Sequence, residues 1–181
     1  RTNDSFVKQF DSDRLSDLFL EYPVLTRLIF TVITQWTDFW VDVVKRLNSD
    51  KNDFVGFFQL GTNPGQAVEI EFIGQESHRY CVLVVQFSCG WQVVYKPRST
   101  QMDGKLSLLM DIFQKDYGIG VVAAPQTMDM GEYGWAQYIN MCGFTGNGQE
   151  KLYFYNFGAV ICISYFLGAC DLHAHNLIAI D

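Results

Sequence analysis

The longest uncharged segment of the chain, residues 152–170, constrains the fold more than any other feature. A helix of this length without charge is stable only across a bilayer or inside a protein, because apolar surface on all its sides must leave water. Asn156 and Ser164 interrupt the segment, and no cluster of Lys or Arg flanks it as expected for a membrane span. We therefore predict a buried core helix and no integral membrane span.

The first third of the chain has a helical pattern. Leu15, Leu18 and Tyr22 recur at helical spacing, and Pro23 suits the first turn of a longer helix that runs to about Leu47. Apolar residues cover more than half of the circumference of this second helix. We expect it to be buried on several sides.

A strand pattern begins after the turn signal Gly61-Thr62-Asn63-Pro64-Gly65. Residues 68–72 alternate between apolar and polar, and two further β-rich runs predict an antiparallel meander that ends at Lys96. The elements expected after it are a short helix at 104–114, a strand at 120–125, and a strand or linker at 133–139.

These elements predict an α+β fold in one domain, with a helical section (1–60) packed on a small antiparallel sheet region (61–145). Residues 146–181 are expected to start a second, helical lobe with the buried helix and a catalytic loop. Because the chain opens with Arg1 and stops at Asp181 directly after the apolar run 177–180, we expect a truncated piece of a larger domain.

The amino-acid composition excludes some classes of function. Hydrophobic residues make up 49% of the chain and aromatic residues 15%, which indicates a folded body rather than a disordered segment. The formal charge of −7 argues against general nucleic-acid binding, although a few local cations suffice for ATP. The 5 cysteines form no CxxC pair, and nothing in the given sequence resembles a signal peptide, so we expect reduced thiols in a cytoplasmic protein.

The strongest chemical signal follows the uncharged segment, in Asp171-Leu172-His173-Ala174-His175-Asn176. Phosphoryl transfer uses an Asp to accept or orient the proton of the attacking hydroxyl and an Asn to hold Mg²⁺ on the phosphates. An Asp and an Asn at this spacing on one loop fit both roles. The pattern resembles the catalytic loop of phosphoinositide lipid kinases more than that of ordinary protein kinases.

A second signal lies upstream, where Lys96 ends a hydrophobic strand as the ATP-phosphate Lys of kinases does. Pro97 removes a backbone donor, so the chain is expected to turn there. Arg98 supplies a second cation beside the first. Together with the Asp and Asn of the later loop, these residues provide the cations, base and metal ligand that phosphoryl transfer needs.

Five short segments then carry a resemblance to one family. They are 22–28, Glu76-Ser77-His78, Tyr95-Lys96-Pro97-Arg98-Ser99, Tyr133-Gly134-Trp135 and the loop 171–179. From about Glu21 to the end, their order and spacing resemble the dehydratase domain of class II lanthipeptide synthetases, with its lipid-kinase-like catalytic core. At 76–80 the chain departs from the family, with Glu in place of the usual Asp and without the usual glycines.

The resemblance implies an incomplete kinase-like fold and an enzyme that is both a transferase and a lyase. Such enzymes use ATP and Mg²⁺ to phosphorylate Ser and Thr in a precursor peptide, then eliminate phosphate to leave dehydroalanine or dehydrobutyrine. The site residues that the resemblance implies are Lys96 at the ATP phosphates, Asp171 as the group that activates the substrate hydroxyl, Asn176 as a Mg²⁺ ligand, His173 as support for the loop, and His78 in the small lobe. Arg98 is expected at the ATP phosphates from its chemistry alone, as a second cation, and a salt-bridged surface Arg is the alternative.

The same resemblance implies partners and missing parts. The partner is a precursor peptide with leader and core segments, and no nucleic acid is expected. The second Mg²⁺-binding Asp, the groups that eliminate phosphate and a zinc cyclase domain are expected beyond Asp181, so this chain alone is expected to be inactive. The expected location is the cytoplasm, with association to the membrane through an export complex left open.

Two other functions remain open on the sequence. His173-x-His175, with Asp171 or Cys170, is a pattern that also suits a metal-dependent hydrolase. A non-catalytic kinase-like module that binds a peptide or partner is the other alternative. Nucleotide binding separates both from the kinase interpretation.

Overall fold

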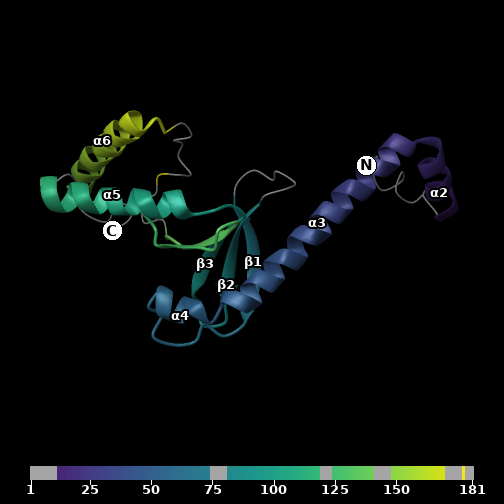
Figure 1. Cartoon of the computed structure of the whole chain (residues 1–181), viewed down its shortest axis with the longest axis horizontal. Helices are drawn as coiled ribbons and strands as arrows, with labels where there is room; N and C mark the ends of the chain where they lie inside the picture. Colours follow the sequence, from purple (N-terminus) through teal and green to yellow (C-terminus); the bar gives the residue numbers. More distant parts are fainter. Residues whose placement is uncertain (1–11, 74–80, 119–123, 141–147, 170–176, 178–181) are drawn as a thin grey trace. The chain divides into compact units, whose positions relative to one another are not determined.

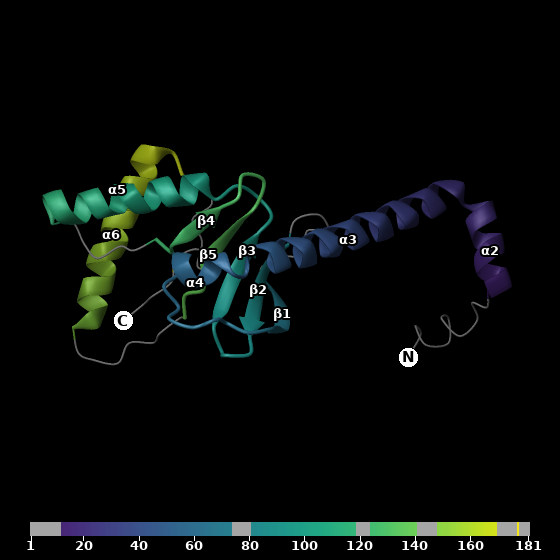
Figure 2. The same ribbon diagram turned by 60° about the horizontal axis from the view of Figure 1, so that its bottom comes forward.

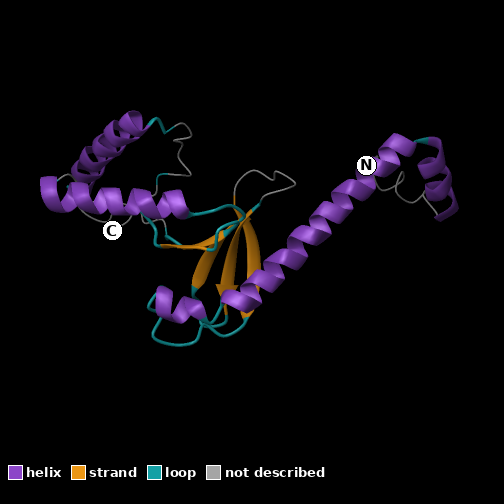
Figure 3. Cartoon of the chain, viewed as in Figure 1, coloured by secondary structure: helices purple, strands orange, loops and turns teal. Residues whose placement is uncertain are grey.

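The computed structural model of the chain (Figure 1) describes residues 12–73, 81–118, 124–140, 148–169 and 177. The chain forms two compact units, Arg1–Ser49 and Asp50–Asp181. Within the described residues, the fold is α+β, as predicted: helices and a five-stranded antiparallel sheet (Figure 3).

The first unit contains α2 (Ser12–Glu21) and nearly all of α3 (Pro23–Asp50), whose first residue is the predicted proline. The junction between the helices is fixed locally. The hydroxyl of Thr26 donates to the Phe19 carbonyl oxygen at 2.8 Å, and the rings of Phe19 and Phe30 are 5.8 Å apart.

The expected burial of α3 on several sides is wrong for the described residues. Leu28, Ile33 and Trp36 are more than half exposed. Among the described residues, only α2 accompanies α3 in its unit, and a single short helix covers one side at most. The helix itself was predicted correctly, since the periodic pattern alone favours it.

The sheet lies in the second unit and has the strand order β1-β2-β3-β5-β4, with every pair antiparallel. Its strands are β1 (Ala67–Ile73), β2 (Val82–Phe87), β3 (Gln92–Lys96), β4 (Thr127–Asp129) and β5 (Gly134–Gln137). The first three form the predicted meander. The β2–β3 turn contains Gly90 at φ 86°, a conformation that glycine adopts without strain.

The core of the second unit is aromatic. Phe54 of α4 (Asp53–Phe57) is fully buried, and its ring lies 5.1 Å from Trp135 and 6.1 Å from Phe87, between centroids. Leu83, Val85, Val93 and Tyr95 of β2 and β3 complete the buried layer. Helix α4, which belongs to the helical section predicted at 1–60, packs with the sheet through Phe54.

Helix α5 (Gln101–Tyr117) connects β3 to β4 and contacts β4. It starts earlier and ends later than the predicted helix at 104–114, and Gly118, directly after it, has the left-handed conformation common at helix ends. Residues 120–123 of the predicted strand at 120–125 lie outside the described residues, Ala124 and Pro125 are not in a strand, and the next strand is β4, which starts at Thr127. The segment that was predicted as strand or linker is strand β5.

Helix α6 (Gln149–Leu167) confirms the helix predicted from the uncharged segment, but its expected burial is wrong. Of its residues only Ile163 and Ser164 are buried, whereas Tyr165 and Phe166 are each 82% exposed. Figure 2 shows α6 crossing α5.

Helix α6 is little buried because α5, its neighbour in the described structure, covers only part of its surface. The two helices enclose an open apolar groove of about 780 Å³, lined by Leu109 and Phe113 of α5 and by α6 residues that include Phe154 and Gly158. One neighbour cannot cover a helix that is apolar on all sides. No helix in the described parts of the chain has the length and apolar character that a membrane crossing needs.

Candidate functional site

Lys96 is the last residue of β3, as predicted, and lies opposite Gly134 of β5. The strand alternates between buried Val93 and Tyr95 and partly exposed neighbours, so Lys96 falls on the alternate face and keeps its ammonium group partly in solvent. Residues 97–100 then turn the chain into α5.

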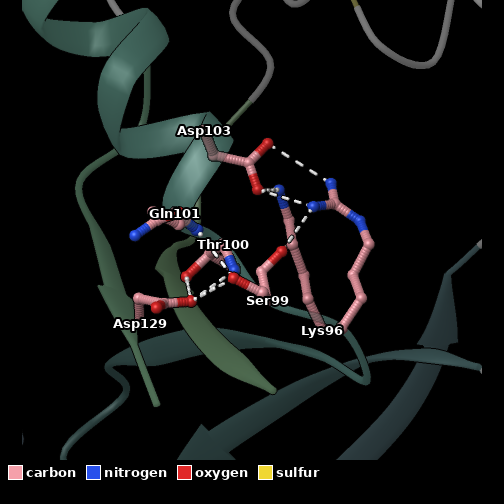
Figure 4. Close-up of polar contacts among 7 residues, drawn as sticks. Lys96, Ser99, Thr100, Gln101, Asp103 and Asp129 are labelled. Carbon is pink, nitrogen blue, oxygen red and sulfur yellow. Dashed lines mark hydrogen bonds and ion pairs between the residues drawn. The ribbon is translucent and has the colours of Figure 1, made fainter. Parts of the chain in front are cut away.

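The ammonium group of Lys96 pairs with Asp103 in the first turn of α5. The distance from Lys96 Nζ to Asp103 Oδ2 is 3.5 Å, and the two side chains are 21% and 26% exposed (Figure 4). Because both side chains are partly buried, water and salt screen this ion pair less than they would screen a fully exposed one. The pair joins the end of a central strand to the start of the helix that follows it.

Arg98 contacts the same carboxylate with both ends of its guanidinium. Its Nη1 and Nη2 donate to Asp103 Oδ2 and Oδ1 at 3.0 and 3.3 Å, and Nη1 also donates to the Ser99 carbonyl oxygen at 2.9 Å. Bidentate pairing of this kind fixes geometry as well as charge. Two cations share one carboxylate, so this cluster of Lys96, Arg98 and Asp103 carries a net positive charge.

A second carboxylate, Asp129 at the end of β4, holds the turn between Lys96 and α5. Its Oδ1 accepts hydrogen bonds from Ser99 Oγ at 2.8 Å and from the Thr100 backbone N–H at 2.6 Å. The hydrogen bond from Ser99, with the backbone N–H groups of Thr100 and Gly131 after it, lowers the pKa of Asp129 below its usual value despite partial desolvation. Asp129 is therefore ionised throughout the neutral pH range.

Gly134, in the middle of the Tyr133-Gly134-Trp135 motif, makes room for this turn. The side chain of Thr100 is fully buried, and a Cβ atom on Gly134 would overlap it. Glycine is therefore required beside Lys96 for steric reasons, not for a left-handed backbone.

The two aromatic residues of the motif anchor β5. Tyr133 Oη and Trp135 Nε1 each donate to Asp50 Oδ2 at 2.8 Å, and Asp50 is 2% exposed. A buried carboxylate is tolerated only where donors satisfy it, as they do here. The motif that supported the resemblance thus has a structural function: it fixes the strand next to Lys96.

The other predicted site residues, His78, Asp171, His173 and Asn176, lie outside the described residues, as do Glu76 and Arg79. Of the predicted set, the structure brings Lys96 and Arg98 together. Within the described parts of the chain, no three His, Cys, Asp or Glu side chains are grouped as a metal site.

Sequence reasoning missed both Asp103 and Asp129. Asp103 had a signal that could have found it, since it lies one turn into the helix that follows a kinase-type Lys. Asp129 had none. It is 29 residues from Thr100, and only the pairing of β4 with β5 brings it to the turn.

Comparison with known protein families shows to which of them the chain belongs. The family described as "Domain of unknown function (DUF4135)" matches residues 22–181, nearly all of the chain. No curated protein matches it. The chain belongs to this family.

Proposed function

We propose that this member of the DUF4135 family is part of a lanthipeptide synthetase dehydratase, which phosphorylates Ser and Thr of a precursor peptide and then eliminates the phosphate. The observation that carries the proposal is the pair between Lys96 and Asp103. Protein kinases hold their ATP-phosphate Lys on strand β3 and pair it with an acid of the next helix, αC. Here the Lys ends the third strand and the acid lies in the helix that follows it.

The chemistry of the cluster suits phosphate groups. Phosphoryl transfer depends on positioning and on neutralising negative charge. Asp103 neutralises one of the two cations, and the other charge is left for an anion. ATP and Mg²⁺, when bound, would supply the phosphoryl group and the metal charge.

The contacts with Asp103 suggest different roles for Lys96 and Arg98. Both terminal nitrogens of the Arg98 guanidinium donate to Asp103, which favours a supporting role over direct contact with phosphates. Lys96 contacts Asp103 through a single nitrogen and, as an ammonium, has further donors for phosphate oxygens. We assign phosphate contact to Lys96.

The remaining roles rest on the sequence resemblance. In the proposal Asp171 accepts the proton of the substrate hydroxyl, His173 supports its loop, Asn176 binds Mg²⁺ and His78 belongs to the small lobe. We place the reaction in the cytoplasm, where ATP is available, with the precursor peptide as partner.

The test uses the intact protein that contains this chain, its precursor peptide, ATP and Mg²⁺, with mass spectrometry of the peptide. The expected products are phosphorylated residues and residues that have lost one water. Lys96→Ala should lower phosphorylation on the order of 100-fold, the usual effect of removing one electrostatic contact to the reacting group.

Lys105→Ala is the matched control, because Lys105 is an exposed lysine on the same helix as Asp103. It should leave the rate within about twofold, as expected for a surface charge. Equal loss in both variants, or no ATP-dependent mass change in the unaltered protein, would contradict the proposal. Peptide binding without any ATP-dependent change would favour a non-catalytic module.

A further inference from the structure

The polar contacts around the turn after Lys96 point to a residue with a task that neither the motif nor the family assigns. Asp129 lies one strand beyond β5, away from the Lys96–Asp103 pair, and yet its carboxylate accepts from the segment between them. We propose that Asp129 is a positioning residue, which holds the start of α5 where Asp103 meets Lys96.

The first step of the argument is the row of residues across the sheet. Lys96 pairs with Gly134, and Gly134 pairs with Asp129, so the three lie in register on β3, β5 and β4. Thr100 fills the space over Gly134, in the middle of the row. The turn therefore folds back across the sheet from Lys96 toward Asp129.

The second step is how the carboxylate holds the helix start. Asp129 Oδ1 accepts from the Thr100 N–H and from Ser99 Oγ, and Ser99 Oγ in turn accepts from the Gln101 N–H at 3.2 Å. The backbone N–H groups at a helix start have no partner within the helix, and a side chain normally caps them locally. Thr100 makes no such cap with its own side chain. Asp129 thus acts as a cap from a distant strand (Figure 4).

The third step links this cap to the cation pair. Asp103 is three residues after Thr100, in the same first turn, so the position fixed for Thr100 also fixes the Cα of Asp103. Without Asp129, the turn loses its polar anchor to β4, and the helix start keeps the packing of Thr100 on Gly134 and the pairing of Asp103 with Arg98 and Lys96. The distance from Asp103 to Lys96 should then become variable.

The experiment measures Lys96 directly in the intact protein. Lysines are methylated with formaldehyde and cyanoborohydride, and mass spectrometry gives the rate at Lys96 relative to exposed Lys105. Asp129→Ala should raise the Lys96 rate about 1.5- to 5-fold, the range that corresponds to loss of a partly exposed ion pair. Asp103→Ala sets the upper limit, and adding Asp129→Ala to it should change nothing further.

Met128→Ala is the matched control, because Met128 is a buried neighbour on the same strand and carries no charge. It removes apolar packing but keeps the Asp129 carboxylate and the backbone pairing of β4 with β5, so the Lys96 rate should stay unchanged. The proposal is overturned if Asp129→Ala leaves the rate at Lys96 unchanged, or if Met128→Ala raises it equally. Should Asp129→Ala not fold, Ser99→Ala removes one link of the cap and decides by the same criteria.

Binding of MgATP to the same variants separates this inference from the proposed function, on which its catalytic meaning rests. A higher Lys96 rate with weaker MgATP binding supports both. A higher Lys96 rate in a protein that does not bind MgATP keeps the positioning role and rejects the kinase function. MgATP binding that depends on Lys96, with a Lys96 rate indifferent to Asp129, keeps the function and rejects the positioning role.

Discussion

The turn after Lys96 and helix α6 each adjoin predicted site residues in the sequence, but different forces hold them. The turn is fixed by polar contacts with Asp103 and Asp129 and by the fit of Thr100 over Gly134. Helix α6 has an apolar surface that α5 covers on one side only. A substitution that adds side-chain volume should therefore destabilise the turn, whereas the exposed side of α6 should accommodate it.

The largest effect is expected at the loop that follows α6. In the intact protein, Asp171→Asn removes the proposed acceptor of the hydroxyl proton, and general-base contributions are on the order of 100- to 10,000-fold. Phosphorylation should nearly stop, and mass spectrometry should find the precursor peptide unmodified. If the variant accumulated phosphopeptide, Asp171 would belong to elimination instead.

A glycine-to-alanine pair compares the two regions by the same chemical change. Gly134→Ala places a methyl group against buried Thr100 and should destabilise the fold by about 1–3 kcal/mol, as overpacking does. Gly158→Ala, on α6, meets nothing within 4 Å and should stabilise it by up to about 1 kcal/mol, because Ala is the better helix former. Urea unfolding of both variants measures the difference. Similar values would mean that the turn is not tightly packed.

The smallest effect is expected from titration of Asp129. Because its pKa is lowered in the folded state, Asp129 contributes its full stabilisation above its unfolded pKa of about 3.8. This contribution is lost as the pH falls through the lowered folded-state pKa. Unfolding of Asp129→Asn should therefore differ from that of the unaltered protein at neutral pH and converge with it in acid.

Phe166→Ser on exposed α6 is the control for this pH series, because it changes no titratable group. Its difference from the unaltered protein should stay constant over the same pH range. A difference for Asp129→Asn that grew as the pH fell would contradict the sign of the pKa shift.

Much of the fold followed from local patterns. Pro23 as the start of a long helix, the meander that ends at Lys96 and the helix in the uncharged segment were all predicted correctly. Each depends on periodicity or turn chemistry over a few neighbouring residues. The burial of α3 and α6 was predicted wrongly, because periodicity shows which surface is apolar and does not show what covers it.

For the candidate site, the sequence predicted Lys96 and Arg98, because a Lys at the end of a strand and before Pro97 is recognised from its immediate neighbours. The carboxylates near them, Asp103 and Asp129, could be identified only from the tertiary structure. Asp103 depends on how the turn enters α5, and Asp129 depends on β4 joining the sheet beyond β5. Contacts between residues far apart in sequence arise from strand pairing and packing, which no local pattern specifies. For the same reason Gly134 became interpretable only when Thr100 was found to occupy the space beside it.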